Sequence, residues 1–174
     1  MAMESHPVQL ALPRPSDTLA FGAEIGSRLL PGDLVILSGD LGAGKTVLTK
    51  GIAAGMGITD VITSPTFVIA RVHRGDGTAL IHVDAYRIGD ALELDDLDLD
   101  TDLTRAAVVI EWGEGIAKRL APESLGIRLI RQPDDDTRTA ELTAVGMRWA
   151  TAIPQLLAAV IGPPTGRGRR IASP

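Results

Sequence analysis

The strongest constraint on this chain is a glycine-rich octet at residues 39–46, which reads Gly-Asp-Leu-Gly-Ala-Gly-Lys-Thr. It matches the pattern G-x-x-x-x-G-K-[ST], in which a curled backbone points several N–H groups at phosphate oxygens. Lys45 supplies a positive charge for the β- and γ-phosphates, and the Thr46 hydroxyl is suited to bind Mg²⁺. The octet therefore predicts a nucleotide-binding loop. Its candidate contacts are Gly39, Asp40, Leu41, Gly42, Ala43, Gly44, Lys45, Thr46 and the following Val47.

The residues on either side of the octet fit this interpretation. The apolar run at residues 34–37 predicts a buried strand before the loop. Residues 47–56 predict a helix after it, whose positive N-terminal end faces the bound anion. A glycine-rich turn that matches by accident is the alternative. The motif requires a strand, a loop and a helix in this order, so the flanking residues favour nucleotide binding.

Length and composition narrow the class of protein. A chain of 174 residues with a net charge of −5 suits one compact domain. We expect residues 1–161 to form this domain and residues 162–174, rich in Gly, Pro and Arg, to be a disordered tail. The absence of cysteine excludes disulfides and Cys-based zinc sites. No apolar run approaches the ~20 residues of a membrane span, and residues 1–7 lack signal-peptide features, so we expect a cytoplasmic protein.

The remaining segments predict a mixed sheet with helices. Two pairs of strands, 67–73 with 79–84 and 125–131 with 137–143, are each separated by turn residues, which is typical of hairpins. Further strands are expected at 8–12 and 106–110, and helices at 17–30 (N-capped by Ser16), 113–120 and 147–161, the last interrupted near Pro154. Residues 89–104 are acidic with interspersed leucines, and they predict a solvated helical segment rather than a calcium loop. The fold class is therefore α/β, a three-layer domain of the P-loop NTPase type with a mixed parallel/antiparallel sheet.

Two acidic residues end predicted strands. Asp84 follows four mostly apolar residues, and Glu111 follows the apolar run 108–110. A nucleotide-binding loop needs such an acid at the end of a neighbouring strand to bind Mg²⁺ or orient water. Both residues are therefore candidates for a role in nucleotide hydrolysis. His82 shares a strand face with Asp84, because side chains alternate. We interpret it as a hydrogen-bonded structural histidine, since no second His or Cys has metal-ligand spacing.

The absence of one motif indicates which nucleotide base the chain recognises. Guanine-specific proteins with this loop typically read the base with an Asn-Lys-x-Asp segment. The chain contains no asparagine, and none of its lysines is followed two residues later by Asp. ATP is therefore the expected nucleotide, with Mg²⁺ as its metal.

Four motifs together resemble one known family. The octet is followed by Ser-Pro-Thr-Phe at 64–67, His-Val-Asp-Ala-Tyr-Arg at 82–87 and Ile-Glu-Trp at 110–112. In this order they resemble the TsaE family of bacterial ATPases of tRNA threonylcarbamoyladenosine synthesis. The resemblance implies an accessory subunit of a TsaD–TsaB heterodimer, which transfers a threonylcarbamoyl group to an adenosine next to the anticodon. ATP hydrolysis by the subunit would reset that complex between turnovers, and the subunit would meet tRNA only through it.

The resemblance also implies roles for individual residues. Lys45 would hold phosphates, Thr46 and Glu111 would bind Mg²⁺, and Asp84 would be needed for hydrolysis. A switch-like Thr66 would sense the γ-phosphate. Further candidates for nucleotide contact are Trp112, whose alternative role is packing, Arg138 at the start of the last strand, and Thr18 in the first helix.

Two other functions share the same motif. A small-molecule or nucleotide kinase would need an acceptor pocket and an Arg-bearing lid, and no segment of this sequence has the character of a lid. A nucleotide-gated binding module with negligible turnover would look almost identical to a slow ATPase. The sequence alone leaves both alternatives open.

Overall fold

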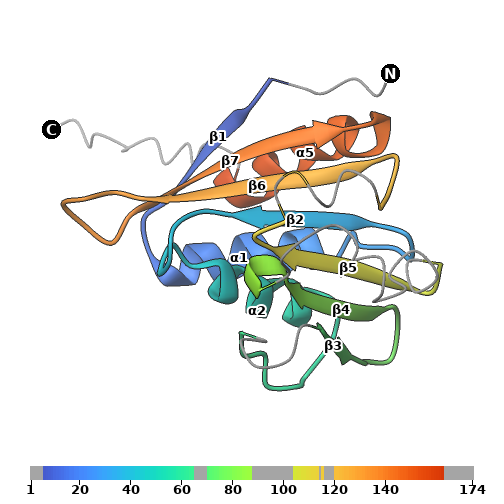
Figure 1. Cartoon of the computed structure of the whole chain (residues 1–174). Helices are drawn as coiled ribbons and strands as arrows, with labels where there is room; N and C mark the ends of the chain where they lie inside the picture. The colour runs from blue at the N-terminus through green and yellow to red at the C-terminus, as the bar shows by residue number, and fades with distance from the viewer. Residues whose placement is uncertain (1–5, 65–69, 88–103, 114, 116–119, 163–174) are drawn as a thin grey trace, which may run out of the picture.

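The computed structural model describes residues 6–64, 70–87, 104–113, 115 and 120–162, which form an α/β fold around a seven-stranded sheet (Figure 1). The strand order is β1-β7-β6-β2-β5-β4-β3. The strands are β1 (Val8–Leu12), β2 (Leu34–Ser38), β3 (Ala70–His73), β4 (Ala79–Asp84), β5 (Ala106–Glu111), β6 (Ser124–Arg131) and β7 (Arg138–Val145). The helices are α1 (Pro15–Gly26), α2 (Lys45–Gly55) and α5 (Met147–Ile161), with a 3₁₀ turn η1 at Ala85–Arg87.

The sheet is mixed, as the sequence predicts. Strand β2 pairs in parallel with β5 and β6, and β5 pairs in parallel with β4. The two predicted hairpins, β3–β4 and β6–β7, are antiparallel, and β1 adds an antiparallel edge strand against β7. Residues 67–69 of the first predicted hairpin strand lie outside the described residues.

The three α-helices of the described residues cover one face of the sheet. Their buried side chains, such as Phe21, Leu48 and Trp149, share one apolar cluster with the residues of that face. A smaller cluster around Ile36, Val83 and Ile110 lies on the other face. Residues 89–103, 114 and 116–119 of the predicted helical segments at 89–104 and 113–120 lie outside the described residues, as do residues 163–174 of the predicted tail.

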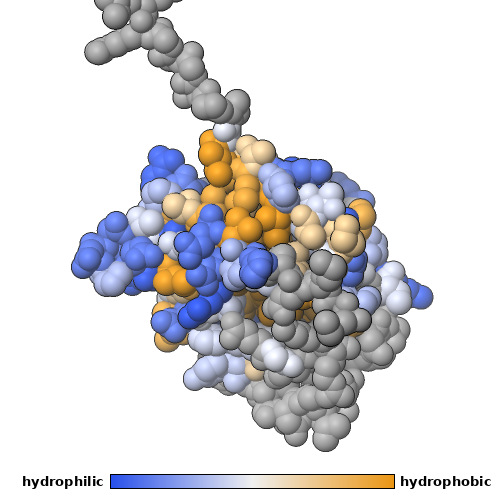
Figure 2. Space-filling model, turned by 90° about the horizontal axis from the view of Figure 1, so that it is seen from above, coloured by the Kyte–Doolittle hydropathy of each residue, from blue (hydrophilic) through white to orange (hydrophobic). Residues whose placement is uncertain are grey.

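The surface at the β1 edge mixes apolar and polar side chains. Figure 2 looks down on this edge and shows apolar surface flanked by hydrophilic residues. Val8 of β1 and Met147 and Ile161 of α5 are among the exposed apolar side chains. In the part of the chain that the structure describes, no helix is both long and apolar enough to cross a membrane.

Helices α1 and α2 approach each other with glycine on both sides of the contact. A Cβ atom built on Gly26 would lie 2.0 Å from the carbonyl oxygen of Ile52, and one on Gly51 would lie 2.3 Å from that of Leu19. Gly22 and Gly55 meet backbone oxygens at 2.5 and 2.1 Å in the same way. Side chains larger than hydrogen would push the helices apart. The four glycines therefore fix the position of α2, which follows the glycine-rich loop.

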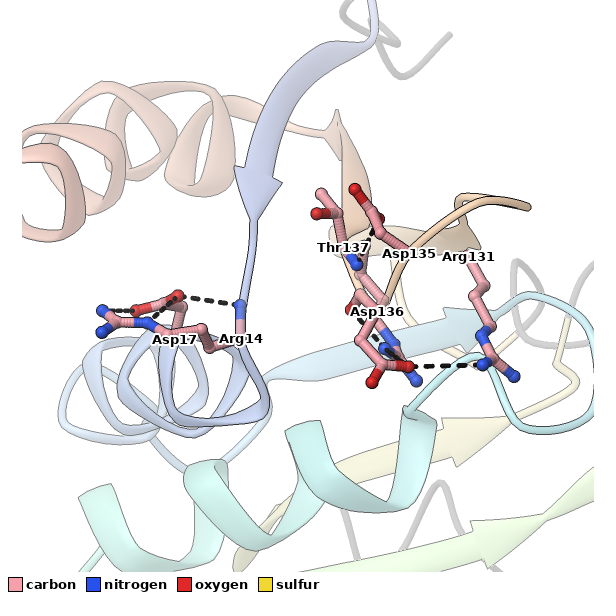
Figure 3. A network of polar contacts seen from close by, with 7 residues as sticks. Arg14, Asp17, Arg131, Asp135, Asp136 and Thr137 are labelled. Carbon is pink, nitrogen blue, oxygen red and sulfur yellow. Dashed lines mark hydrogen bonds and ion pairs between the residues drawn. The ribbon is translucent and has the colours of Figure 1, made fainter.

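Helix boundaries differ from the predictions at three places. Helix α1 begins at Pro15, where proline suits the first turn, and Arg14 rather than Ser16 is its N-cap. The Asp17 carboxylate accepts hydrogen bonds from the Arg14 N–H at 2.9 Å and from its guanidinium (Figure 3). The helix ends at Gly26, because Arg28 and Leu29 form tighter three-residue turns beyond it.

The other two differences concern α2 and α5. Helix α2 begins at Lys45, two residues before the predicted start, since Gly44 adopts the left-handed N-cap conformation. Helix α5 continues through Pro154 without the predicted interruption. Pro154 and Ala150, whose carbonyl loses a helical partner, are both exposed, so water can satisfy that carbonyl.

We predict that Gly26→Ala lowers the free energy of unfolding by about 1–3 kcal/mol, because the added methyl group overpacks the contact with α2. Urea unfolding of the two proteins measures this change. The control is Gly77→Ala in the turn between β3 and β4, where a Cβ atom meets nothing within 4 Å. Equal stability of the Gly26 variant and the wild type would show that the helices can separate freely.

Candidate nucleotide-binding cleft

The carboxyl ends of the parallel strands bring the predicted site together. Strand β2 leads into the glycine-rich loop, and β4 and β5 end at Asp84 and Glu111. Asp84 pairs with Glu111 in the strand register, and Glu111 pairs with Leu37 of β2. Ligands of open α/β sheets bind at this edge. Both predicted acids therefore stand beside the loop.

Glycine is needed at the two ends of the loop. Gly39 has φ 130°, and a Cβ atom there would lie 2.2 Å from the carbonyl oxygen of Leu129 in β6. Gly44 has φ 107° and is the N-cap of α2. Between them the Ala43 N–H donates to the Asp40 carbonyl at 3.0 Å, which closes a tight turn. The loop thus passes close to β6 and enters α2 with its first N–H groups at the cleft.

Lys45 is folded back onto the loop that carries it. Its side chain is only 5% exposed, and Nζ donates to the carbonyl oxygens of Gly39 at 2.7 Å and Asp40 at 3.0 Å. The ammonium also lies 3.9 Å from the centre of the Trp112 ring. Burial lowers the pKa of Lys45, and the nearby Glu111 carboxylate is the largest opposing influence. A desolvated ammonium with these partners is well placed to bind an anion.

The two acids are buried and held by different partners. Asp84 Oδ1 accepts a hydrogen bond from the Tyr86 N–H at 3.0 Å, and Asp84 Oδ2 lies 3.5 Å from the Ser64 hydroxyl. Glu111 is 3% exposed, and its Oε1 lies 2.8 Å from His82 Nε2. The prediction that His82 is hydrogen-bonded is thereby confirmed. Asp84 Oδ2 is thus weakly held, by a long contact with Ser64, whereas Glu111 Oε1 has a short contact with His82.

Trp112 has an unusual backbone conformation. Its φ of 62° is left-handed, which side chains rarely adopt. Its N–H donates to the Leu37 carbonyl at 2.8 Å and so anchors the residue to β2. The ring lies 5.3 Å from the Tyr86 ring, tilted by 55°. The indole thus lies over Lys45, and Trp112 is among the residues that line the cleft described below.

These residues surround a cleft of about 600 Å³. Most of the predicted contacts line it together. The lining consists of Leu41, Gly42, Gly44, Lys45, Thr46, Val47, Ser64, Asp84, Tyr86, Glu111, Trp112 and Arg138. Gly39 and Asp40 line a smaller adjoining hollow of about 160 Å³, and Ala43 is buried within the loop.

Arg138, a predicted nucleotide contact, is among the residues that line this cleft. Its guanidinium donates to the Asp136 carbonyl oxygen and lies 3.5 Å from the Asp136 carboxylate. The same carboxylate contacts Arg131 at 3.3 Å, and Thr137 N–H donates to Asp135 in the same turn (Figure 3). The hairpin turn between β6 and β7 thus holds Arg138 beside the loop.

Two predicted residues are not placed at the cleft. Thr18 is buried in α1 and is absent from the described lining, and Thr66 lies outside the described residues. Their contacts with nucleotide stay predictions. Tyr86, for which the sequence predicts no role, also lines the cleft. Its position two residues after Asp84 is the signal that could have identified it.

The oxygen atoms at the cleft suit a hard cation. Thr46 offers a hydroxyl, and Asp84 and Glu111 offer carboxylates, which are ligands that Mg²⁺ accepts. Among the described residues no cluster of three or more His, Cys, Asp or Glu could hold a metal alone. The donor set therefore fits a Mg²⁺ ion that arrives with phosphate oxygens of its own.

A second hollow of about 370 Å³ lies among β2, β6 and β7. Ile36, Gly126 and Thr143 are among its lining residues, and Ile36 belongs to the sheet face away from the α-helices. The described lining of this hollow contains none of the residues predicted from the sequence.

Comparison with known proteins agrees with the motifs and the fold. Residues 12–140 match the family described as "Threonylcarbamoyl adenosine biosynthesis protein TsaE". The chain belongs to the TsaE family. Membership gives it a role in the biosynthesis of threonylcarbamoyladenosine in tRNA, as the resemblance of its four motifs implied.

Individual TsaE relatives cover most of the chain. It is 56% identical to the protein named "tRNA threonylcarbamoyladenosine biosynthesis protein TsaE" of Mycobacterium tuberculosis over 138 residues, which are 74% of this chain and 82% of the relative. The protein of the same name from Streptomyces coelicolor is 49% identical over 79% of this chain and 97% of its own length. The crystal structure of Bacillus subtilis YdiB superposes with a TM-score of 0.73 at 32% identity, covering 90% of this chain and 95% of that chain.

Proposed function

We propose that this TsaE-family chain binds ATP with Mg²⁺ in the cleft and hydrolyses it as an accessory subunit of tRNA threonylcarbamoyladenosine modification. The observation that carries this proposal is the convergence of the loop, Lys45, Asp84 and Glu111 on one cleft. A loop that offers N–H groups beside a lysine suits phosphates, and two buried acids suit metal binding and hydrolysis.

Each residue has a distinct part in the proposed reaction. The N–H groups of the loop and of the first turn of α2 hold the phosphate oxygens. Lys45 exchanges the carbonyls of Gly39 and Asp40 for the β- and γ-phosphates. Thr46 and Glu111 supply oxygen ligands to Mg²⁺, which neutralises charge on the phosphates when it is bound. Asp84 uses its weakly held Oδ2 to orient the attacking water and accept its proton.

Exposed apolar side chains at the cleft support action through a protein partner. Leu41 is 93% exposed and Tyr86 is 72% exposed, although both line the cleft. A bound TsaD–TsaB-like heterodimer would cover such residues beside the nucleotide. Hydrolysis would then reset that complex between turnovers in the cytoplasm, where tRNA is modified. The chain would meet tRNA only through this complex.

We predict that Lys45→Ala weakens ATP binding at least tenfold, because a charge-assisted contact to phosphate is worth ~1.5–3 kcal/mol. Isothermal titration calorimetry measures the affinity. Lys50→Ala is the matched control, since Lys50 lies on the exposed side of the same helix. An affinity of the Lys45 variant equal to that of the wild type would contradict phosphate binding at this loop.

We predict that Asp84→Ala and Glu111→Ala remain folded and hydrolyse ATP about 10²–10⁴-fold more slowly, as expected when a positioned acid–base group is lost. Glu111→Ala also weakens the Mg²⁺ dependence of ATP binding. Phosphate release in the assembled complex measures the rates, and circular dichroism checks the fold. Wild-type rates in both variants would refute the roles proposed for the strand-end acids.

The function itself is tested by the steady-state ATPase activity with and without purified TsaD–TsaB. We expect activity to rise on association, and a pull-down to recover more heterodimer with ATP than with ADP. Thr66→Ala should remove this difference while sparing ADP binding. Phosphoryl transfer to a nucleoside or sugar acceptor, with no response to the heterodimer, would favour a kinase. Association that depends on ATP but occurs without turnover would favour a binding module.

A further inference from the structure

The buried imidazole of His82 has no part in the mechanism above. We propose that His82 is a positioning residue that orients the Glu111 carboxylate toward the metal bound with the nucleotide. This inference rests on the proposed function and deepens it. It concerns the hydrogen bond from His82 to Glu111, a proposed metal ligand. Loss of this bond should change the Mg²⁺ dependence of ATP binding, which loss of packing alone would not do.

The strand register brings the two side chains together. His82 pairs with Val109 across the β4–β5 ladder, so Glu111 is its diagonal neighbour, two residues further along β5. Diagonal neighbours on one face are within reach of long side chains. The Nε2 atom of His82 lies 2.8 Å from Oε1 of Glu111. His82 is 0% exposed and Glu111 is 3% exposed, so water does not compete for this bond.

The two imidazole nitrogens have different surroundings. Nε2 faces a carboxylate oxygen, whereas Nδ1 is buried and has no hydrogen-bond partner among the described residues. An ionised carboxylate only accepts hydrogen bonds, so Nε2 carries the proton and its N–H donates a hydrogen bond to Oε1. Glu111 Oε2 has no hydrogen-bond partner in the described part of the chain, and Glu111 is among the residues that line the cleft.

His82 is also the lasting partner of this acid. The Lys45 ammonium is close enough to Glu111 for its pKa to respond to the carboxylate. In the proposed reaction, however, Lys45 moves its hydrogen bonds to the phosphates. His82 is fixed within the sheet and keeps Oε1 bound in both states. Hydrogen bonds of this kind to a metal ligand set its orientation, and their loss costs about 10–100-fold in metal affinity.

The test measures ATP affinity by calorimetry across a range of Mg²⁺ concentrations and in EDTA, for the wild type, His82→Leu and His82→Gln. We expect His82→Leu to raise about 10–100-fold the Mg²⁺ concentration at which the gain in ATP affinity is half-maximal. The ATP affinity measured in EDTA should change less than about twofold. His82→Gln should restore most of the Mg²⁺ dependence, because its amide N–H can reach the position of Nε2.

The matched control is His73→Leu. His73 is also buried, but its Nδ1 lies 3.4 Å from Asp60, and neither residue lines the described cleft. Its replacement should leave the Mg²⁺ dependence unchanged. Wild-type Mg²⁺ dependence in His82→Leu, or equal losses of affinity with Mg²⁺ and in EDTA, would overturn the inference.

The test also covers a His82→Leu variant that does not fold and a wild-type protein that does not bind ATP. If His82→Leu does not fold, His82→Gln and His82→Asn decide the question, because the shorter Asn cannot reach Glu111. Equal Mg²⁺ dependence of these two variants would then overturn the positioning role. If the wild-type protein binds no ATP, the proposed function falls and this inference falls with it, whereas ATP binding that ignores His82 overturns only the inference.

Discussion

The close contact of α1 with α2 is the constraint on which the cleft depends. Gly26 and Gly51 bring backbone against backbone, so α2 has little freedom to shift. The N-terminus of α2 is therefore fixed relative to β2, and the glycine-rich loop must bridge a set distance. Gly39 makes this possible, because the loop passes within van der Waals contact of the Leu129 carbonyl. Packing far from any ligand thus determines where the loop N–H groups point.

Charge at the cleft is partly compensated before any ligand binds. Lys45 compensates part of the negative charge of Asp84 and Glu111, and loop carbonyls and the Trp112 ring occupy its remaining contacts. A bound triphosphate would draw the ammonium away and leave the acids in need of a cation. This supports binding of Mg²⁺ together with the nucleotide rather than before it. The left-handed backbone of Trp112 stores strain at the same point, as is common where side chains must face a ligand.

Much of this arrangement could be predicted from the sequence, because local patterns encode it. The octet predicts the loop, and apolar runs that end in Asp84 and Glu111 predict two neighbouring strand ends. The tertiary contacts could not be predicted in this way. The bond from His82 to Glu111 does not follow from sequence spacing, because it depends on the register of β4 against β5. The start of α1 was mispredicted because Asp17 caps it through Arg14, and α5 tolerates Pro154 because the affected carbonyl is exposed.

Hydrogen–deuterium exchange with and without Mg·ATP tests most directly whether the cleft at the ends of β2, β4 and β5 is the nucleotide site. We expect slower exchange of the backbone amides at 39–47, 84–86 and 111–112, and no change around the hollow among β2, β6 and β7. Slower exchange confined to that hollow, or no response of residues 39–47 at saturating ATP, would contradict it.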